Sequence, residues 1–445
     1  MANIVVAIYN PLIRQNGMYP YFETFLDGLK DAGNNVLCFE KIAAETILDE
    51  EIPEEYLDKI KKFKPDLFIF FNNQFWDISK YFEQPIIIYD VDSPNVYCNI
   101  DKLKKNKRYK YLTIQRAGID IIQNALEDNE IEVEYIPPFT GVQAENIEQT
   151  INIGFCGSHW LWNDFTQIEE FLSKNPSDHD RKIAKEIYKA FQEYPFCTSD
   201  VLYENLNVDV DKKLDIKNLY QFTTRVSGVK RLRCLLELED LGLEIRGYLW
   251  NSPKSTPLKA FPELLLSYSN KVINNNLTTQ NFYNSAKIGF NTNSIQAKSG
   301  FSWRVFDILA SNACLVTEYT SDLSSFDFEI LSYKTPAEAR SICEKLLNNE
   351  ELRKEYVQKA HEIIDKKHRF ISILPLLEDF AGVILHSDNS GSIEMVRTIK
   401  IEKNTKNTIT KKEEFPVIDK KQLNFQNKIL YKLSRCLYKS IKTKP

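Results

Sequence analysis

Arg304 and Asp307 lie one helical turn apart in the segment SGFSWRVFDILASNACLVTEY, residues 299–319. The segment predicts a turn at Gly300, a helix, and then a buried strand that ends beside Glu318. On the ligand side of such a helix, a carboxylate can accept both hydroxyls of a ribose, and a guanidinium can meet a phosphate through its planar fork. The other interpretation is an i,i+3 ion pair that stabilises a surface helix.

Two more carboxylates, Asp90 and Asp92, follow the apolar run PIIIY. At the carboxyl end of a strand they are well placed for general-base chemistry or for binding sugar hydroxyls, and Asp92 is the preferred base candidate. Their D-x-D spacing also occurs in metal-dependent sugar transferases, but the surrounding architecture does not fit that class. A capped turn before Pro94 is the structural alternative.

A third candidate is the segment GFCGSHWLW, residues 154–162. A strand that leads into Gly157 and Ser158 lets backbone N–H groups approach a phosphate. His159 could act on a substrate or could pack beside the neighbouring tryptophans.

The loop after the first predicted strand, residues 10–17, lacks the G-x-G-x-x-G pattern of dinucleotide-binding dehydrogenases. Arg14, Asn16 and Gly17 are the residues of this loop that could contact an acceptor. An ordinary connecting loop is the alternative.

The elements that would position these residues alternate between strand and helix. Near-continuous apolar runs are typical of parallel strands covered on both faces, and they predict strands near 3–9, 35–39, 66–71, 85–90, 109–115 and 133–136. The chain therefore predicts a doubly wound α/β domain over 1–138, a linker over 139–150 and a second such domain over 151–385. A polar, aromatic stretch at about 160–226 predicts a helical insertion in the second domain.

Beyond residue 385 the composition changes. From Asp388 onward there are 14 Lys/Arg against 6 Asp/Glu, although the whole chain has a net charge of −5. We expect a polar linker over 386–421 and a basic amphipathic helix over 422–445. A basic tail suits an anionic membrane surface, whereas the acidic body argues against nucleic-acid binding. Packing on the N-terminal domain, or pairing in a homodimer, are the alternatives for this helix.

The eight cysteines form no C-x-x-C pair, and no apolar run approaches the length of a membrane span. The chain enters a predicted strand almost at once, without a signal peptide. These features predict a cytoplasmic protein with reduced cysteines, one that could also sit peripherally on the inner face of the cell membrane.

The segment NTNSIQAKSGFSWRVFDILASNACLVTEYTSDLSSF resembles the donor-site signature of bacterial GT-B glycosyltransferases, in particular the CgeB-like proteins within glycosyl transferase group 1. The segments IGFCGS and PIIIYDVDSP are also similar to that group. The resemblance implies a GT-B fold of two Rossmann-like domains facing a cleft. It implies a nucleotide-sugar donor as co-substrate, with no bound metal or other cofactor, because cationic side chains and helix dipoles stabilise the diphosphate.

The resemblance also implies roles for residues of the 298–307 segment. Asp307 would bind the ribose, and Arg304, Gly300 and Lys298 would stabilise the diphosphate. Many retaining members carry E-x7-E over this segment, and the first acid is replaced here by Ser299. This departure leaves the stereochemical outcome open.

The resulting prediction is a hexosyltransferase-like enzyme of polysaccharide biosynthesis. It would move a sugar to a bacterial surface glycan, a lipid-linked intermediate or a protein. The alternative is a non-catalytic GT-B shell that binds a nucleotide or glycan.

Overall fold

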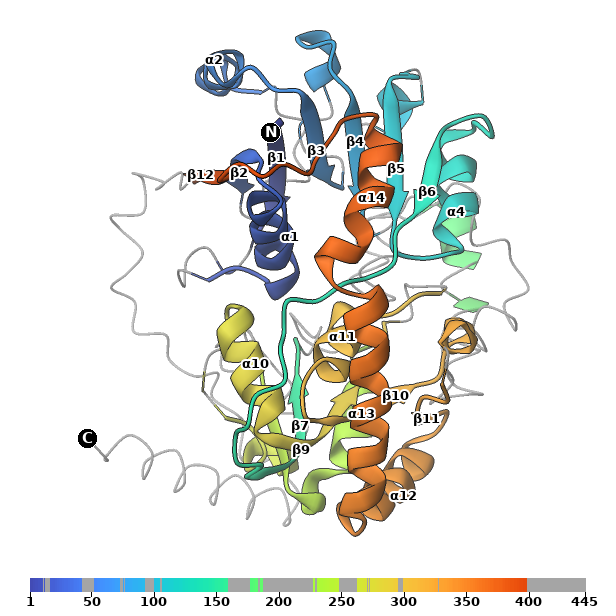
Figure 1. The fold of residues 1–445 in the computed structure, drawn as a ribbon. Coiled ribbons are helices and arrows are strands. Elements are labelled where there is room, and N and C mark those ends of the chain that lie inside the picture. Colours follow the sequence, from blue (N-terminus) through green and yellow to red (C-terminus); the bar gives the residue numbers. More distant parts are fainter. Residues whose placement is uncertain are drawn as a thin grey trace, which may run out of the picture.

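The structure, a computed structural model, describes residues 1–10, 12, 17–41, 52–72, 75, 77–92, 100–104, 106–158, 177–182, 185–186, 227–228, 230–247, 262–269, 271, 273–294, 299–326 and 328–397. These residues form two parallel sheets, one above the other in Figure 1. The two α/β domains predicted from the sequence are thereby confirmed. The predicted insertion lies almost entirely outside the described residues, and the predicted C-terminal helix lies wholly outside them.

The N-terminal domain is built on a seven-stranded sheet of order β12-β2-β1-β3-β4-β5-β6. Its strands are β1 (Asn3–Tyr9), β2 (Asn35–Lys41), β3 (Leu67–Phe71), β4 (Ile86–Asp90), β5 (Tyr109–Thr113), β6 (Val133–Tyr135) and β12 (Ser392–Arg397). Its helices are α1 (Pro20–Asp31), α2 (Glu54–Phe63), α3 (Ile100–Leu103) and α4 (Gly118–Leu126), with a 3-10 turn η3 (Ile78–Lys80).

Alternate residues of the central strands enter two separate cores. Ile4, Val6 and Ile8 of β1 pack with α1 on one face of the sheet, whereas Val5 and Ala7 pack with α2 on the other. This double burial is why the strands read as unbroken apolar runs.

The C-terminal domain has a five-stranded sheet of order β11-β10-β9-β7-β8. Its strands are β7 (Ile151–Cys156), β8 (Leu243–Arg246), β9 (Ala286–Asn291), β10 (Cys314–Glu318) and β11 (Ser332–Tyr333). A helical segment at 230–236 and α12 (Pro336–Leu347) cover one face, while α10 (Asn276–Asn284), α11 (Trp303–Leu309) and α13 (Glu350–Lys367) cover the other. The described residues of this domain also include the 3-10 turns η5 (Glu239–Leu241), η6 (Pro262–Leu265) and η7 (Ser321–Ser325).

Two predicted strands differ from the structure. Residues 273–275 are irregular rather than extended, because Asn275 caps α10 through a reciprocal capping box with Thr278. The predicted strand at 329–333 is reduced to the two residues of β11, which pair with the end of β10.

After α13 the chain returns to the N-terminal domain. The next helix, α14 (Phe370–Ala381), packs its apolar face into the same core as α1, and Figure 1 shows it continuing upward from α13 onto the upper sheet. Strand β12 then pairs with β2 over six residues. The polar linker predicted to begin at residue 386 therefore contains an edge strand of the N-terminal sheet. Its side chains are exposed or only partly buried, which is why the sequence pattern there is weak.

Several contacts join the two domains. The indole of Trp303 stacks on the ring of Tyr21, and the backbone N–H of Met18 donates to the carbonyl of Asn274 at 2.7 Å. The carboxylate of Glu23 accepts a 2.6 Å hydrogen bond from the backbone N–H of Asn276 at the start of α10. Because a helix N-terminus favours a negative charge, Glu23 of the N-terminal domain stabilises the N-terminus of α10 in the C-terminal domain. In the described part of the chain, no helix is both long enough and apolar enough to cross a membrane.

Candidate active site

Both sheets change strand order beside their first strand, between β1 and β3 in one domain and between β7 and β9 in the other. At such a switch point the connections leave in opposite directions, and ligands of open α/β sheets bind there, outside the carboxyl ends of the strands. Two polar clusters occupy these positions. One contains Asp92, and the other surrounds the end of β7.

In the C-terminal cluster, Arg304 of α11 reaches back to the end of β7. Its Nη1 donates to Asn291 Oδ1 at 2.7 Å, and its guanidinium carbon lies 5.1 Å from the ring centroid of Phe155. The hydroxyl of Ser302 donates to the same Asn291 oxygen at 2.9 Å. Asn291, the last residue of β9, therefore fixes the orientation of Arg304.

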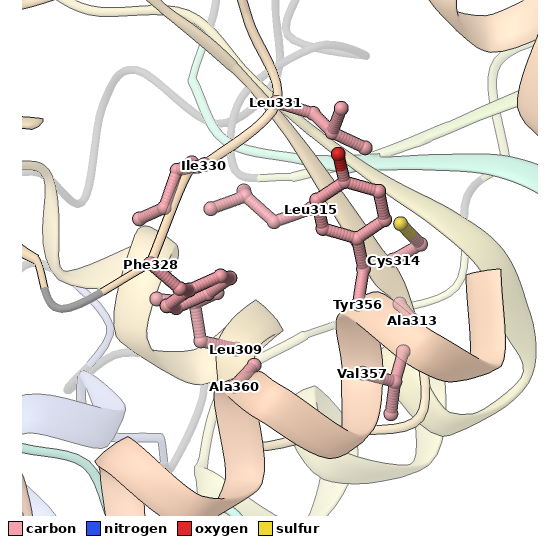
Figure 2. Close-up of a pocket in the computed structure, with 10 residues that line it drawn as sticks. All are labelled: Leu309, Ala313, Cys314, Leu315, Phe328, Ile330, Leu331, Tyr356, Val357 and Ala360. Atoms are coloured by element: carbon pink, nitrogen blue, oxygen red, sulfur yellow. The ribbon is translucent and has the colours of Figure 1, made fainter. Parts of the chain in front are cut away.

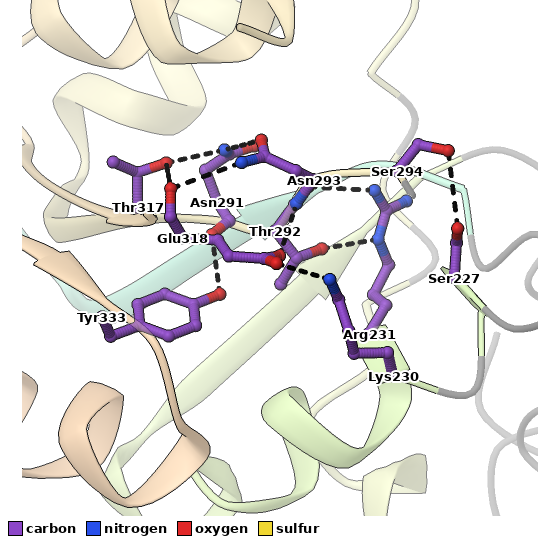
Figure 3. Close-up of polar contacts among 10 residues, drawn as sticks. All are labelled: Ser227, Lys230, Arg231, Asn291, Thr292, Asn293, Ser294, Thr317, Glu318 and Tyr333. Atoms are coloured by element: carbon purple, nitrogen blue, oxygen red, sulfur yellow. Dashed lines mark hydrogen bonds and ion pairs between the residues drawn. The ribbon is translucent and has the colours of Figure 1, made fainter. Parts of the chain in front are cut away.

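A second guanidinium, that of Arg231, also lies over this ring. Its guanidinium carbon is 5.2 Å from the Phe155 centroid, and its side chain is almost fully buried. Figure 3 shows it bonded to Thr292, whose hydroxyl accepts from Nε at 2.7 Å. Arg231 also donates to the carbonyl of Ser158. Burial, and secondarily the charge of Arg304, lower the pKa of Arg231.

A buried ion pair lies next to Arg231 and stabilises the segment that follows β9. The side chains of Lys230 and Glu318 are 2% and 3% exposed and contact each other directly. Glu318 also accepts the backbone N–H of Asn293 at 2.9 Å, so the pair holds the residues that follow β9 (Figure 3). A buried pair is stable only when such further hydrogen bonds satisfy it.

The predicted phosphate turn, Gly157 and Ser158, lies close to both arginines. A Cβ at position 157 would fall 2.5 Å from Nη2 of Arg304, so only glycine leaves room for this guanidinium. The backbone N–H of Gly157, however, donates to the carbonyl of Arg246 at 3.0 Å. The turn therefore brings cationic side chains together, and the Gly157 N–H is already engaged within the sheet.

Asp307 does not pair with Arg304, although both residues are described. Its Oδ1 instead accepts a 2.7 Å hydrogen bond from the hydroxyl of Thr140, in the linker between the domains. Burial raises the pKa of Asp307 to about 6, against the lowering effects of Thr140 and of the Arg304 charge. The surface ion pair considered as an alternative for these two residues is not formed.

Ser299 and Gly300 contact the N-terminal domain. The Ser299 hydroxyl accepts from the backbone N–H of Ala117 at 3.2 Å. Gly300 has a φ of +84°, and its N–H donates to Asp322 at 2.7 Å. A Cβ on Gly300 would lie 2.9 Å from the side chain of Gln115. These two residues thus bring the start of α11 against the loop that follows β5.

In the N-terminal cluster, Asp92 is held by side chains from two neighbouring strand ends. The hydroxyl of Tyr9 and the amide of Asn72 both donate to its Oδ2, the latter at 2.9 Å. Burial raises the pKa of Asp92, and the two hydrogen bonds counteract that rise. Asp90, two residues earlier, is buried at the end of β4.

The remaining predicted residues are placed as follows. Gly17 is buried, its carbonyl accepts from Asn10 at 2.7 Å, and a Cβ there would lie 2.6 Å from Asn274 of the other domain. The other predicted candidates lie outside the described residues: Arg14, Asn16, His159 and Lys298.

Four residues of these clusters were not among those predicted from the sequence: Arg231, Asn291, Thr140 and Asn72. Arg231 follows Lys230 at the start of an amphipathic helix, where a pair of basic residues reads as surface. Thr140 lies in a polar linker without periodicity. The polar run Asn291–Ser294 directly after an apolar strand was the available signal, because strand ends at a switch point carry ligand-binding side chains.

A small pocket lies away from this cluster in the C-terminal domain, between α11, β10 and α13 (Figure 2). Its walls are mostly aliphatic and aromatic, and its volume is about 10 Å³. This space is about that needed by one water molecule, so the pocket is a packing defect and not a nucleotide site.

Comparison with known proteins finds a family match within the C-terminal domain. A family model described as glycosyl transferase-like matches residues 230–378. No curated protein matches the chain. Among solved structures, T4 phage BGT in complex with UDP and Mn2+ is 14% identical, with a TM-score of 0.48 over 85% of this chain and 100% of that chain.

Two further structures are similar at lower identity. Anabaena HepE in complex with UDP and glucose is 10% identical, with a TM-score of 0.47 over 86% of this chain and 100% of that chain. WaaG, a glycosyltransferase involved in lipopolysaccharide biosynthesis, is 9% identical, with a TM-score of 0.39 over 85% and 100% of the two chains. The segment that resembles the glycosyl transferase-like family contains Arg231, Asn291, Arg304 and Asp307, whereas Phe155 and Gly157 precede it.

Proposed function

We propose that this protein is a glycosyltransferase that moves a sugar from a nucleotide-sugar donor to a hydroxyl acceptor. The observation that carries the proposal is the convergence of Arg231 and Arg304 on the ring of Phe155. Two like charges beside each other repel, and an anion bound between them relieves this repulsion. A diphosphate bears that charge, and its charge increases as the sugar leaves.

Asp307 would bind the nucleotide ribose. Thr140 occupies its Oδ1, and no described residue donates to its Oδ2. This oxygen, within the helix that also carries Arg304, is available to a sugar hydroxyl. We propose that cationic side chains take the place of a metal ion, and that the donor is the sole co-substrate.

Asp92 would act as the general base. The acceptor oxygen attacks C1 of the donor sugar, and its proton passes to Asp92. The bond from C1 to the diphosphate oxygen breaks, and the diphosphate leaves with the electron pair beside the two guanidinium groups. A base within hydrogen-bond reach of the acceptor hydroxyl is a requirement of this chemistry. His159 and Lys298 remain candidates for additional contacts.

The acceptor proposed is a bacterial surface glycan, a lipid-linked intermediate or a protein, and the sugar proposed is a hexose. Residues 422–445 would hold the enzyme on the anionic inner face of the membrane. Co-sedimentation with phosphatidylglycerol liposomes tests this point, because a chain lacking residues 422–445 should no longer bind. Equal binding of both chains contradicts it, and sedimentation velocity of both would then show whether the segment pairs two subunits.

The second candidate function is a shell that binds a nucleotide or glycan without turnover. It is favoured by Ser299, which replaces an acid and is engaged with Ala117 of the N-terminal domain. Turnover separates the two candidates.

The test is release of nucleoside diphosphate from a panel of UDP-, GDP- and dTDP-sugars, alongside calorimetric binding of the free nucleotides. We expect release from at least one donor, and at least tenfold weaker nucleotide binding in Arg304→Ala. Arg340→Ala is the matched control, because Arg340 pairs with Asp240 on the surface. Nucleotide binding without release under any acceptor supports the shell. Binding equal in wild type and Arg304→Ala contradicts the proposed site.

A further inference from the structure

Asn72 follows β3 in a left-handed backbone conformation, with a φ of 55°. Asparagine tolerates this region better than most residues that carry a side chain. Its backbone N–H donates to the carbonyl of Tyr89 at 2.8 Å, and its side chain is 6% exposed. The residue is therefore fixed at the switch point between β1 and β3.

The side-chain amide of Asn72 makes contacts in both directions. Its Oδ1 accepts from the backbone N–H groups of Val91 and Asp92, at 3.2 and 3.3 Å. Its Nδ2 donates to Asp92 Oδ2 at 2.9 Å. A planar amide that accepts from the backbone and donates to the carboxylate fixes both the turn after β4 and the plane of the Asp92 side chain.

The second donor comes from the other side of the switch point. Tyr9, the last residue of β1, donates its hydroxyl to the same oxygen, Oδ2. Among the described residues, none donates to Oδ1 of Asp92. Oδ2 of Asp92 thus accepts two hydrogen bonds, and Oδ1 can accept a hydrogen bond or a proton from a ligand.

We propose that Asn72 and Tyr9 are positioning residues that turn Oδ1 of Asp92 toward the acceptor hydroxyl and keep the carboxylate ionised. This inference rests on the proposed function. It adds a reason for the residue types at the ends of three consecutive strands in space, β1, β3 and β4. Each donor stabilises the charged carboxylate, so each opposes the effect of burial on its pKa.

The surroundings of Asp92 make this assignment testable. Tyr9 is the titratable group that contacts it, and the phenol donates as the neutral form. Asp90 lies two residues earlier and is 2% exposed. No lysine, arginine or histidine among the described residues contacts Asp92. The ionisation of Asp92 therefore depends on two hydrogen bonds that can be removed one at a time.

The decisive variant is Asn72→Asp. Aspartate retains the oxygen that accepts from Val91 and Asp92, but it cannot donate to Oδ2 and places a second carboxylate there. Tyr9→Phe removes the other donor alone. Asn106→Asp is the matched control: Asn106 accepts from the N–H of Arg108 at 3.1 Å and donates to Ser79 at 2.6 Å, before the start of β5. It makes the same chemical change at the opposite edge of the sheet.

The measurement is a pH titration of aspartate 13Cγ signals in the full chain, with Asp92 assigned by its loss in Asp92→Asn. We expect the pKa of Asp92 to rise by about one pH unit in Tyr9→Phe and by more in Asn72→Asp, with no change in Asn106→Asp. UDP-glucose turnover, where present, should move its acidic limb to the same higher pH while the KM for the donor stays constant.

An unchanged Asp92 titration in both Tyr9→Phe and folded Asn72→Asp overturns the proposal. A shifted titration without diphosphate release from any nucleotide sugar supports the positioning of the carboxylate and contradicts glycosyl transfer as its purpose. A shifted titration with an unshifted pH profile overturns the role of this carboxylate as the base. If Asn72→Asp does not fold, Tyr9→Phe alone decides, because it leaves the Asn72 turn intact.

Discussion

The indole of Trp303 lies parallel to the ring of Tyr21, with centroids 3.9 Å apart and an interplanar angle of 8°. Tyr21 is in turn stacked on Phe139 at 4.6 Å. The three rings come from the C-terminal domain, the N-terminal domain and the linker between them. The two domains are thus joined by a continuous aromatic stack directly beside Arg304.

Trp303→Ala should weaken this junction. Aromatic pairs contribute about 0.5–1.5 kcal/mol beyond the area they bury, and truncation of a large ring adds the loss of burial. We expect urea unfolding to show a loss of about 2–4 kcal/mol. Trp303→Phe should recover part of it, and a double-mutant cycle with Tyr21→Leu should show coupling. Additive effects of the two substitutions would contradict a direct stacking contribution.

Asp307→Asn should separate stability from ligand binding. The pKa of Asp307 is raised to about 6 in the folded protein and is near 3.9 in an unfolded chain, so folding favours the protonated form. The wild type therefore loses stability as the pH rises from about 4 through 6, and the amide variant avoids this loss. We expect Asp307→Asn to be more stable than wild type by about 1–3 kcal/mol at pH 7.5 and nearly equal at pH 4.

The same variant should bind UDP at least tenfold more weakly at pH 7.5, because a neutral amide is a weaker acceptor than a carboxylate for a ribose hydroxyl. Differential scanning fluorimetry and calorimetry measure both effects on one sample. Lower stability at neutral pH with unchanged UDP affinity would show that the carboxylate is structural.

Gly157→Ala should disturb the position of Arg304 without unfolding the domain. The new Cβ would lie 2.5 Å from a guanidinium nitrogen, which has to move away from the end of β7. We expect the Kd for UDP to rise at least tenfold. Gly154→Ala, within the strand that precedes Gly157, is the control, since its Cβ meets Phe282 and Ala286 at 3.0 and 3.1 Å and should lower the Tm alone. Equal UDP affinities in both variants would argue against the Arg304 site.

Glu318→Gln should destabilise the C-terminal domain by about 3–5 kcal/mol, because it removes the carboxylate that contacts the buried ammonium group of Lys230. The double substitution Lys230→Met/Glu318→Gln should recover much of this loss. Urea unfolding of the four proteins measures the coupling. If Glu318→Gln alone were neutral, Lys230 would have another compensating group.

A chain that ends at residue 397 should be far more stable than one that ends at residue 385. The shorter chain lacks β12 and exposes the edge of β2, together with the Glu40 carboxylate that Arg397 contacts at 2.8 Å. Exposed strand edges promote association. We expect the shorter chain to unfold at a lower temperature and to aggregate, as measured by scanning fluorimetry and light scattering. Equal melting of the two chains would show that β12 is dispensable.

The central strands could be predicted from the sequence because a strand that is buried on both faces needs apolar residues at successive positions, as in Leu67–Phe71. The position of Arg304 and Arg231 over the same ring could not be predicted. It depends on Phe155, which is distant from both along the chain, and on the helical segment that follows residues 160–226, where the sequence pattern is weak. The partner of Asp307 was hidden for a similar reason, because Thr140 belongs to a linker where composition predicts only the absence of regular structure.

The position of Asp92 could be predicted from the strand-end rule, but its two donors could not. Tyr9 and Asn72 read as the polar ends of their own strands, and only the strand order brings them to one carboxylate. In the same way, β12 could not be assigned to the N-terminal sheet. Its pairing with β2 joins residues more than 350 positions apart, and no local pattern encodes that distance.

In the described residues the chain passes between the domains twice, at residues 138–142 and 368–370, and the two passages are hydrogen-bonded to each other. His368 Nδ1 lies 2.8 Å from the carbonyl of Pro138, and the N–H of Thr140 donates to the carbonyl of His368 at 3.0 Å. Two interdomain segments that are hydrogen-bonded together act as one hinge. Such a hinge permits the domains to rotate about it and resists their sliding or twisting against each other. Since Thr140 also donates to Asp307, the carboxylate proposed to bind the ribose lies at this hinge, and a rotation of one domain about it would move Asp307 least.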